Sequence, residues 1–329
     1  MLVLSKEDIK KVFTMKEALQ SSREALRMHS QGKSIVPLRI NIGVQKAQGQ
    51  SLFMPAYVEE QNALGIKIVS IFPENIERGK PSTLGKMILL DNQTGDVCCI
   101  IDGTYLTQLR TGALQGVATD ILARKNAKIA VLFGTGGQAA TQLEAMLHVR
   151  DLEEIKVIGT NFARTELFVA TMKKEFSKFN TKISAISDAD CSIKEADIIT
   201  TITTSNKPVF NGTLVKKGAH INGIGAYTPQ MQELPEILVQ GADKIVFDTK
   251  DGVLAEAGDI LIPLQAGLIT NADFQGELGE IILGHVKGRE TEQEITIFKA
   301  VGTAVIDVIM ARKIYEKALA ANVGKNMSV

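Results

Sequence analysis

The strongest constraint on the fold of this chain is a glycine turn that joins a buried strand to a helix. The apolar run at 128–133 leads into GTGGQA at 134–139 and then a helical pattern, the context that gives the motif G-x-G-x-x-G/A its meaning. Gly134 permits the tight turn, Gly136 lets the backbone approach a pyrophosphate, and Ala139 allows close helix–strand packing. Because the helix start also offers free N–H groups to phosphates, the turn predicts a dinucleotide site. The predicted contacts are Gly134, Gly136, Gly137, Gln138 and Ala139.

Downstream of this turn, short apolar runs alternate with helical patterns. Helices are predicted at 139–150 and 164–176, with a short acidic one before residue 197. Alternation of strands and helices is typical of a doubly wound parallel sheet, so an α/β fold of the Rossmann type is expected here. The predicted strands cover residues 128–133, 154–159, 181–187, 197–204, 218–225 and 244–249.

The regions on either side of this pattern have a different texture. Residues 6–30 have the spacing of one amphipathic helix, with Ser5 and Asp8 as its N-terminal cap. Short β-rich runs separated by turn signals fill 35–101 and predict an antiparallel sheet. A helix is predicted at 104–124, and the run at 295–320 reads as one long apolar helix that packs on the N-terminal part or on another subunit.

Length and charge narrow the class of protein. A chain of 329 residues exceeds what one hydrophobic core usually serves, which favours two domains. Lys plus Arg and Asp plus Glu both total 37, so the chain has no net positive charge that would favour binding to nucleic acid or to an anionic membrane. The sequence has no 18-residue apolar run, and its three cysteines lack zinc-site spacing, so we expect a cytoplasmic protein with reduced thiols.

The residues after the second predicted strand bear on the choice between NAD and NADP. An NAD site usually offers a carboxylate there to the ribose 2′-hydroxyl group. The stretch GTNFART at 159–165 has no acid, whereas Asn161 and Arg164 have groups that suit a 2′-phosphate. The sequence therefore favours NADPH and leaves NADH open. The alternative is that Arg164 only caps or solvates the next helix.

Three cations lie within apolar segments and need partners. Arg39 lies in PLRINI, Lys67 in GIKIVSIF, and Arg110 ends the helical stretch LTQLR. A buried cation is costly unless a counter-charge or ligand accompanies it. An internal salt bridge explains one such residue, but three of them in one domain suggest a pocket for a carboxylate. No catalytic triad, H-E-x-x-H motif or metal cluster offers another chemistry, and the four histidines have no mutual spacing.

Several of these segments resemble the ornithine cyclodeaminase/mu-crystallin family. The matching stretches are GIKIVSIFPEN, RGKPSTLGKMILLD, IDGTYLTQLRTGA, GTGGQA and IFKAVGTAVID. The resemblance implies a Rossmann domain, at 119–299, inserted in a mixed α+β domain, at 1–118 and 300–329, that binds substrate and forms a homodimer. It also implies that Arg39, Lys67 and Arg110 bind the substrate carboxylate, with Lys67 close to the reacting carbon and acting in catalysis with Arg110. By the same resemblance, the residues near the nicotinamide are Ser82, Thr201, Ile202 and Thr203, and Ser82 also contacts the substrate.

One position departs from the family's cyclodeaminases. These enzymes have V-G-G-D in the strand that matches HINGIGAYTP, and the acid engages the distal amine of the substrate. Ala226 stands at that position, and a methyl group cannot hold an ammonium group. We therefore expect an NAD(P)H-dependent reductase of a cyclic imino acid, such as Δ1-pyrroline-2-carboxylate or Δ1-piperideine-2-carboxylate, giving proline or pipecolate. The alternatives are an alanine dehydrogenase, an ornithine cyclodeaminase, or an NADPH-binding protein without turnover.

Overall fold

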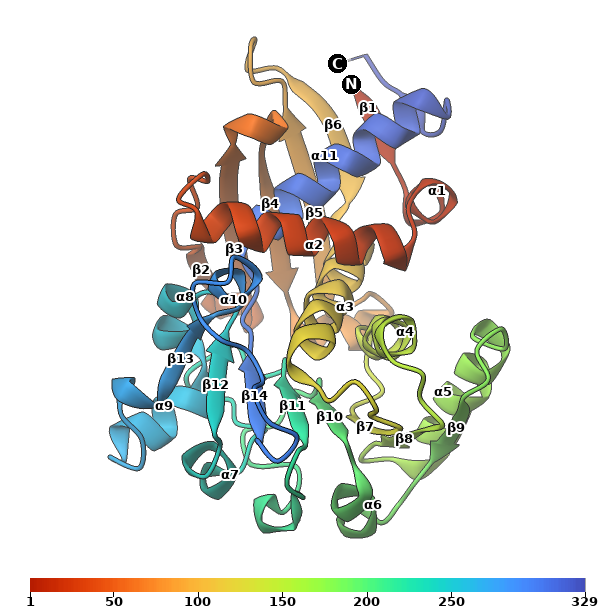
Figure 1. Cartoon of the computed structure of the whole chain (residues 1–329). Helices are drawn as coiled ribbons and strands as arrows, with labels where there is room; N and C mark the ends of the chain where they lie inside the picture. Colours follow the sequence, from red (N-terminus) through yellow and green to blue (C-terminus); the bar gives the residue numbers. More distant parts are fainter. Residues whose placement is uncertain (329) are drawn as a thin grey trace. The chain divides into compact units, whose positions relative to one another are not determined.

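The computed structural model describes residues 1–328, which divide into two compact units. The first unit comprises Met1–Arg110 and Thr303–Val329, and the second comprises Thr111–Gly302. The chain therefore leaves the first unit, builds the whole of the second, and returns to complete the first (Figure 1).

The first unit is built on a seven-stranded sheet in the order β15-β1-β6-β5-β4-β3-β2. Its neighbours pair antiparallel, as the turn signals between the β-rich runs predict, except that β1 and β6 run parallel. The strands are β1 (Leu2–Leu4), β2 (Ile40–Val44), β3 (Gly49–Val58), β4 (Ala63–Ile71), β5 (Thr83–Leu90), β6 (Val97–Asp102) and β15 (Lys325–Asn326). The 3₁₀ turns η1 (Gln45–Ala47), η2 (Glu59–Gln61) and η3 (Pro73–Arg78) connect them.

Two predictions about helices in this unit are wrong. The stretch at 6–30 forms two helices, α1 (Lys6–Val12) and α2 (Met15–Ser30), because Thr14 starts a new capping box with Glu17. The expected cap of the first helix, Ser5 with Asp8, is confirmed.

The run at 295–320 is likewise divided. It begins as strand β14 (Thr296–Lys299) of the second unit, and only then forms helix α11 (Ala304–Ala320). Gly302, at φ 87°, lies in the connection between them, and the short apolar segment before it is buried on both sides as a central strand.

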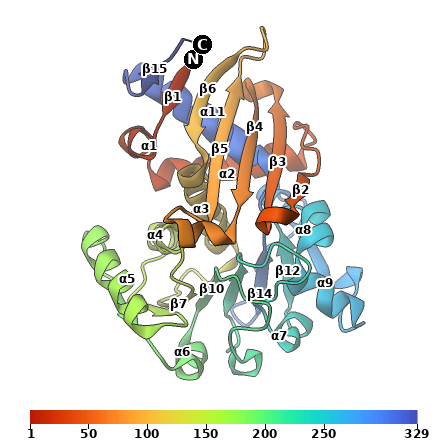
Figure 2. The same cartoon turned by 180° about the vertical axis from the view of Figure 1, so that it is seen from behind.

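The two long helices of the first unit lie on one face of its sheet. Helix α11 packs against β3, β4 and β5, and α2 packs against α11, as predicted for the final helix. The opposite face is seen in Figure 2, where the strands lie in front of both helices. Side chains on this open face are largely apolar and only half-buried. They include Phe53, Pro55, Tyr57, Leu64, Ile66, Ile68, Ile88 and Ile100.

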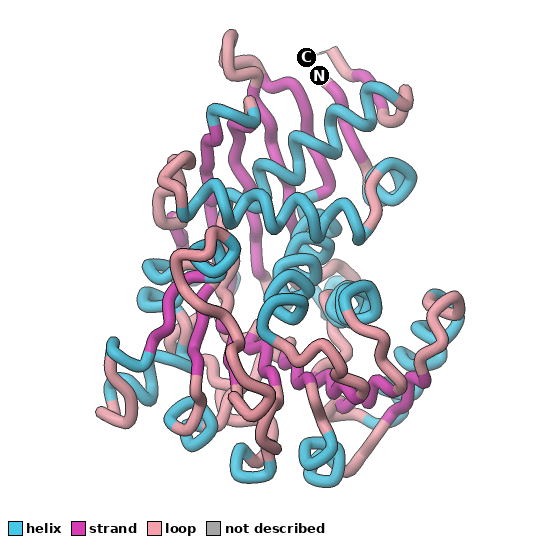
Figure 3. The backbone as a smooth tube through the Cα atoms, viewed as in Figure 1, coloured by secondary structure: helices cyan, strands magenta, loops and turns pink. Residues whose placement is uncertain are grey.

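The second unit is an eight-stranded sheet in the order β13-β12-β14-β11-β10-β7-β8-β9. Every pair of neighbours is parallel, which confirms the Rossmann-type prediction. Figure 3 distinguishes the strands, in magenta, from the helices, in cyan. The strands besides β14 are β7 (Ile129–Phe133), β8 (Glu154–Ile158), β9 (Lys182–Ala185), β10 (Ile198–Thr201), β11 (His220–Gly223), β12 (Lys244–Phe247) and β13 (Phe274–Glu277).

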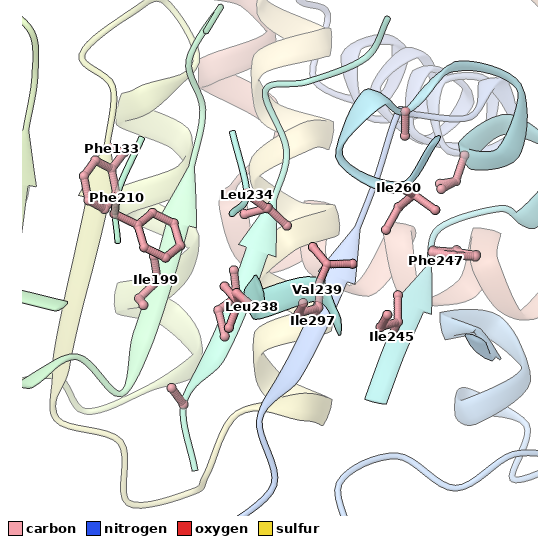
Figure 4. Close-up of a cluster of buried hydrophobic side chains, with 14 of the residues drawn as sticks. Phe133, Ile199, Phe210, Leu234, Leu238, Val239, Ile245, Phe247, Ile260 and Ile297 are labelled. Carbon is pink, nitrogen blue, oxygen red and sulfur yellow. The ribbon is translucent and has the colours of Figure 1, made fainter. Parts of the chain in front are cut away.

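Helices connect these strands. Helix α3 (Gly103–Leu122) begins in the first unit and continues into the second. The others are α4 (Ala139–Val149), α5 (Phe162–Glu175), α6 (Ala189–Glu195), α7 (Glu236–Gln240), α8 (Lys250–Glu256), α9 (Gly258–Gln265) and α10 (Leu278–Ile282), with 3₁₀ turns η4 (Gly212–Leu214) and η5 (Asn271–Asp273). The hydrophobic cluster in Figure 4 includes Phe133 stacked on Phe210, with ring centroids 5.5 Å apart.

The described residues, 1–328, can be searched for membrane-spanning helices, metal-binding groups and disulfides. Within this range, none of the helices combines the length and the apolar character needed to cross a bilayer. The same residues hold no group of three or more His, Cys, Asp or Glu side chains placed to bind a metal ion. Cys98, Cys99 and Cys191 are all free thiols.

Candidate active site

The glycine turn follows β7 at the carboxyl edge of the parallel sheet. Gly134 adopts a φ of 111°, and a Cβ atom there would lie 2.5 Å from the carbonyl oxygen of Ile202. Only glycine fits this position, for both reasons. A Cβ atom on Gly136 would meet nothing within 4 Å, so the backbone borders open space where a pyrophosphate would approach. Ala139, which begins α4, is fully buried and allows the close packing that the motif predicts.

Gln138 supplies a further sign that this turn suits a polar ligand. Its side-chain oxygen is buried and makes no hydrogen bond within residues 1–328. The first N–H groups of α4 begin at the next residue, and these groups favour anions. The free N–H groups at the start of α4 and the open space at Gly136 together fit the diphosphate of a dinucleotide. Gly137 lies in the chain between Gly136 and Gln138.

The segment expected beside the nicotinamide leaves the sheet next to the glycine turn. Strand β10 pairs with β7, and the backbone N–H of Ile202 donates to the carbonyl of Phe133 at 2.9 Å. The side chain of Thr201 is fully buried, with its hydroxyl 3.5 Å from the carbonyl oxygen of Asn222. Thr203 is half-buried, and its backbone N–H donates to the carboxylate of Glu233. The structure therefore places residues 201–203 beside the glycine turn, but the Thr201 side chain is buried in the protein interior.

The end of β8 carries the residues expected to choose the cofactor. Asn161 is the N-cap of α5, because its side-chain oxygen accepts a hydrogen bond from the backbone N–H of Arg164 at 2.9 Å. The guanidinium-bearing side chain of Arg164 is exposed in the first turn of that helix. A Cβ atom on Gly159 would lie 2.5 Å from the hydroxyl of Thr165, so a carboxylate-bearing side chain does not fit there without movement.

Two of the three predicted substrate cations meet a carboxylate in the first unit. The ammonium nitrogen of Lys67, on β4, donates to Oδ2 of Asp307, on α11, at 2.6 Å. Nε of Arg110, on α3, lies 3.1 Å from Oδ1 of the same carboxylate, in an ion pair without a well-aligned hydrogen bond. Lys67 and Asp307 are fully buried and Arg110 is nearly so. The alternative explanation of a buried cation, an internal salt bridge, therefore applies to both Lys67 and Arg110.

This cluster carries an excess of positive charge, which acts on Lys67. Burial and the charge of Arg110 lower the pKa of Lys67 from 10.5 to about 7, although Asp307 opposes the shift. The charge of Arg39 also contributes to lowering this pKa, which places Arg39 within electrostatic reach. Lys67 is thus able to gain or lose a proton near neutral pH.

Arg39 and Ser82 are the two other residues of the first unit that the sequence assigns to the substrate or the cofactor. Arg39 precedes β2 and is half-buried. Ser82 precedes β5 and is half-buried as well, and its carbonyl oxygen accepts a hydrogen bond from the backbone N–H of Phe72 at 2.8 Å. The structure thus brings Lys67 and Arg110 into one cluster and leaves the roles of Arg39 and Ser82 as predictions.

Sequence reasoning missed two acidic residues, Asp307 and Glu233. Asp307 is the shared partner of the buried cations, and Glu233 binds the backbone of the segment after β10. A signal for Asp307 was present, because it is the one acid in the apolar run AVIDVIMA that begins the last helix. No comparable signal marks Glu233, which lies in an irregular loop among other polar residues.

Comparisons with known proteins agree over the whole length of the chain. The model of the ornithine cyclodeaminase/mu-crystallin family matches residues 1–322. A Δ1-pyrroline-2-carboxylate reductase of Bacillus cereus is 40% identical over 327 residues, which cover 99% of both chains. The solved structure of a Δ1-pyrroline-2-carboxylate reductase from Thermococcus litoralis, in complex with NADH and L-proline, is 42% identical, with a TM-score of 0.95 over 99% of this chain and 100% of that one. An archaeal alanine dehydrogenase dimer with bound NAD is 35% identical, with a TM-score of 0.92 over 100% and 99% of the two chains.

Proposed function

Because this chain belongs to the ornithine cyclodeaminase/mu-crystallin family, we propose that it is an NAD(P)H-dependent reductase of a cyclic imino acid. The proposed reaction converts Δ1-pyrroline-2-carboxylate or Δ1-piperideine-2-carboxylate to L-proline or L-pipecolate, which places the enzyme in proline metabolism. The observation that carries the proposal is 40% identity to a Δ1-pyrroline-2-carboxylate reductase over 99% of both chains. The chain is an oxidoreductase that acts on a C=N bond with a nicotinamide cofactor.

The environment of Ala226 argues against the cyclodeaminase alternative. Ala226 is fully buried, and its backbone N–H donates to Glu233 at 2.9 Å. The position therefore has no side-chain carboxylate to hold the distal ammonium group of ornithine. Alanine dehydrogenase stays the second candidate, because a chain of that name from Archaeoglobus fulgidus is 35% identical over 326 residues.

The proposed roles of the protein side chains follow from their charge. The bound nicotinamide supplies the hydride that reduces the C=N bond. Arg39 and Arg110 would bind the substrate carboxylate, for which planar guanidinium groups are well suited. Lys67, whose pKa is about 7, would hold the proton that the imine nitrogen takes up, or would join the carboxylate contacts.

The proposal is tested by following NADPH oxidation with pyrroline-2-carboxylate, piperideine-2-carboxylate, and pyruvate plus ammonia in parallel. We expect the cyclic imines to be reduced with much higher kcat/KM than pyruvate plus ammonia. The reverse ranking would favour alanine dehydrogenase. Release of ammonia from ornithine without net change in NADPH would identify a cyclodeaminase, and nucleotide binding with no turnover of any substrate would contradict all three.

NADPH is the cofactor that we propose, with NADH as a weaker one. The support is the stretch between Ile158 and Thr165, which offers no carboxylate to a ribose and exposes Arg164. Arg164→Ala should raise the Kd for NADPH by about tenfold or more and change the Kd for NADH little, because only the 2′-phosphate loses a charge-assisted contact. Binding titrations with both nucleotides check this, and Lys173→Ala, on the same helix, is the matched control. Equal losses for the two nucleotides would contradict it.

A second copy of the chain is the partner proposed for the open face of the first unit. On β2, Ile40 and Ile42 are 59% and 51% exposed, and the half-buried apolar side chains of β3 to β6 continue the same surface. Such a large apolar surface is typical of an interface, and the zero net charge does not oppose self-association. Light scattering should give twice the mass of the chain, and Ile66→Glu should give a single chain. A monomeric wild type would contradict the proposal.

We also propose that the protein acts on small molecules and that it is located in the cytoplasm. The balance of 37 basic and 37 acidic residues provides no net charge for nucleic acid. The three free thiols fit a reducing compartment, where disulfides are rare.

A further inference from the structure

One buried carboxylate in the second unit binds the backbone of two loops at once. Glu233 is fully buried, in the segment between β11 and α7. One of its oxygens accepts the backbone N–H of Thr203 at 2.5 Å, after β10. The other accepts the N–H groups of Gly225 at 2.6 Å and Ala226 at 2.9 Å, after β11. We propose that Glu233 is a positioning residue, which fixes these two loops so that the segment at 201–203 has the right place beside the nicotinamide.

Tight packing around Gly225 shows how little freedom the two loops have. A Cβ atom there would lie 2.3 Å from the carbonyl oxygen of Thr203 and 2.5 Å from Oε1 of Glu233. The loop after β11 therefore lies directly against the loop after β10, with the carboxylate of Glu233 between their N–H groups. Strands β10 and β11 are neighbours in the sheet, but their ladder ends at Thr201 and Gly223. Beyond the end of the β10–β11 hydrogen-bond ladder, the Glu233 carboxylate links the two segments through its hydrogen bonds to both loops.

Glu233 is itself held by a second buried carboxylate. Oδ1 of Asp259, on α9, accepts the backbone N–H groups of Glu233 at 2.6 Å and Leu234 at 2.9 Å. Oδ2 of Asp259 lies 2.8 Å from the ammonium nitrogen of Lys299, at the end of β14, and both side chains are fully buried. Burial and the nearby charge of Asp259 raise the pKa of Glu233, while Lys299 and the hydrogen bond from Thr203 oppose the rise. The backbone of Glu233 is thus held by Asp259 on α9, which is itself paired with Lys299 on β14.

The functional meaning of this arrangement rests on the proposed function, because only a nicotinamide-dependent enzyme would use the place beside the ring that the family resemblance gives to residues 201–203. Hydride transfer depends steeply on the distance and angle between the reacting atoms, and a shift of about 1 Å can cost about a hundredfold in rate. The glycine turn holds the diphosphate separately, so the two ends of the cofactor depend on different parts of the chain. Loss of the Glu233 carboxylate should therefore affect hydride transfer far more than nucleotide affinity.

The test is Glu233→Gln, which keeps the size of the side chain but turns an N–H group toward backbone donors. In the cofactor-free protein, hydrogen exchange should accelerate by about tenfold or more at the amides that face the new NH2 group, either Thr203 or the pair Gly225 and Ala226, because these amides lose their acceptor. The Kd for NADPH should stay within about threefold of wild type, and kcat should fall by about tenfold to a hundredfold with KM little changed. The hydrogen-exchange and Kd readouts need no turnover, so they remain informative even if the assigned reaction is wrong.

Asp197→Asn is the matched control. Asp197 is also a buried carboxylate that binds backbone N–H groups, those of Lys128 at 2.8 Å and Ile129 at 3.0 Å, but it precedes β10 at the opposite edge of the sheet. Its replacement should lower the thermal midpoint and leave kcat unchanged. The proposal is overturned if Glu233→Gln leaves kcat or the three amides unchanged, or if it lowers midpoint, Kd and kcat in the same pattern as Asp197→Asn.

A second variant covers the case in which Glu233→Gln does not fold. Gly225→Ala keeps the carboxylate but pushes a methyl group against Thr203 and Glu233, so the two loops must separate slightly. The expected pattern is the same, with a preserved Kd for NADPH and a reduced kcat. Unchanged kcat in folded Gly225→Ala would show that the spacing of these loops is not critical, and would overturn the proposal.

Discussion

Lys67→Met is expected to lower kcat/KM for imine reduction by about two to three decades, which corresponds to about 3–4 kcal/mol of lost transition-state stabilisation. The protein should stay folded, because Asp307 keeps Arg110 as a partner 3.1 Å away when Lys67 is gone. In the wild type, activity should decline as the pH rises through about 7, where Lys67 loses its proton. Steady-state kinetics across pH 5.5–9 should show this decline in the wild type and not in the variant.

The control for Lys67→Met is another buried lysine in an ion pair, Lys244. Its ammonium nitrogen lies 2.8 Å from Glu290, in the second unit. Lys244→Met should reduce the thermal midpoint without changing kcat/KM. Near-normal turnover by Lys67→Met, or a collapsed midpoint in that variant, would defeat the proposed role of Lys67.

The same cluster makes an opposite prediction for Asp307. Asp307→Asn leaves two buried cations without an anion, and should cost about 3–5 kcal/mol of the free energy of unfolding at pH 6. The loss should be smaller at pH 9, because Lys67 is then neutral in the folded protein. The lowered pKa of Lys67 also means that the unfolded chain binds more protons between about 7 and 10.5, so this group makes wild-type stability rise with pH over that window. Urea unfolding at both pH values tests the difference.

Gly136→Asp should abolish nucleotide binding in a protein that remains folded. A Cβ atom at Gly136 meets nothing within 4 Å, so the first side-chain atom of the substitution has free space. Its carboxylate would instead occupy the space of the diphosphate and repel it. Gly136→Ala is the graded comparison, with an intermediate loss of affinity from steric contact alone. NADPH titration with a parallel thermal scan checks both, and unchanged affinity in folded Gly136→Asp would remove this turn from the cofactor site.

Features that depend on local sequence were predictable. The parallel sheet follows from short apolar runs that alternate with helical patterns, and the glycine turn follows from a motif whose spacing reflects backbone geometry. Gly134 illustrates this, because its φ of 111° is a requirement of the turn itself. The capping box of Ser5 with Asp8 is equally local, since its two hydrogen bonds join residues three positions apart.

Features that depend on distant partners were not predictable in the same way. In the sequence, Lys67 is a cation in an apolar segment with no acidic partner nearby. Its partner, Asp307, is 240 residues further along the chain and is found only in the folded structure. Helical periodicity at 6–30 continues through the break at Thr14, because both helices bury apolar side chains and both pack against α11. The sequence does not separate the strand at 296–299 from the following helix, because a run of four residues is too short to show a strand or helix period.

The insertion of the second unit between the two parts of the first has a consequence for synthesis on the ribosome. Every strand of the parallel sheet lies within Thr111–Gly302, so that unit is complete as soon as residue 302 has emerged. The first unit has to wait for α11, which covers β3 to β5 and brings Asp307 to Lys67. At about 5–20 residues per second, the 240 residues between these two take roughly 12–48 s to translate. During that interval strands β3 to β5 lack the helix that covers them, so the unit whose synthesis begins first is the one completed last.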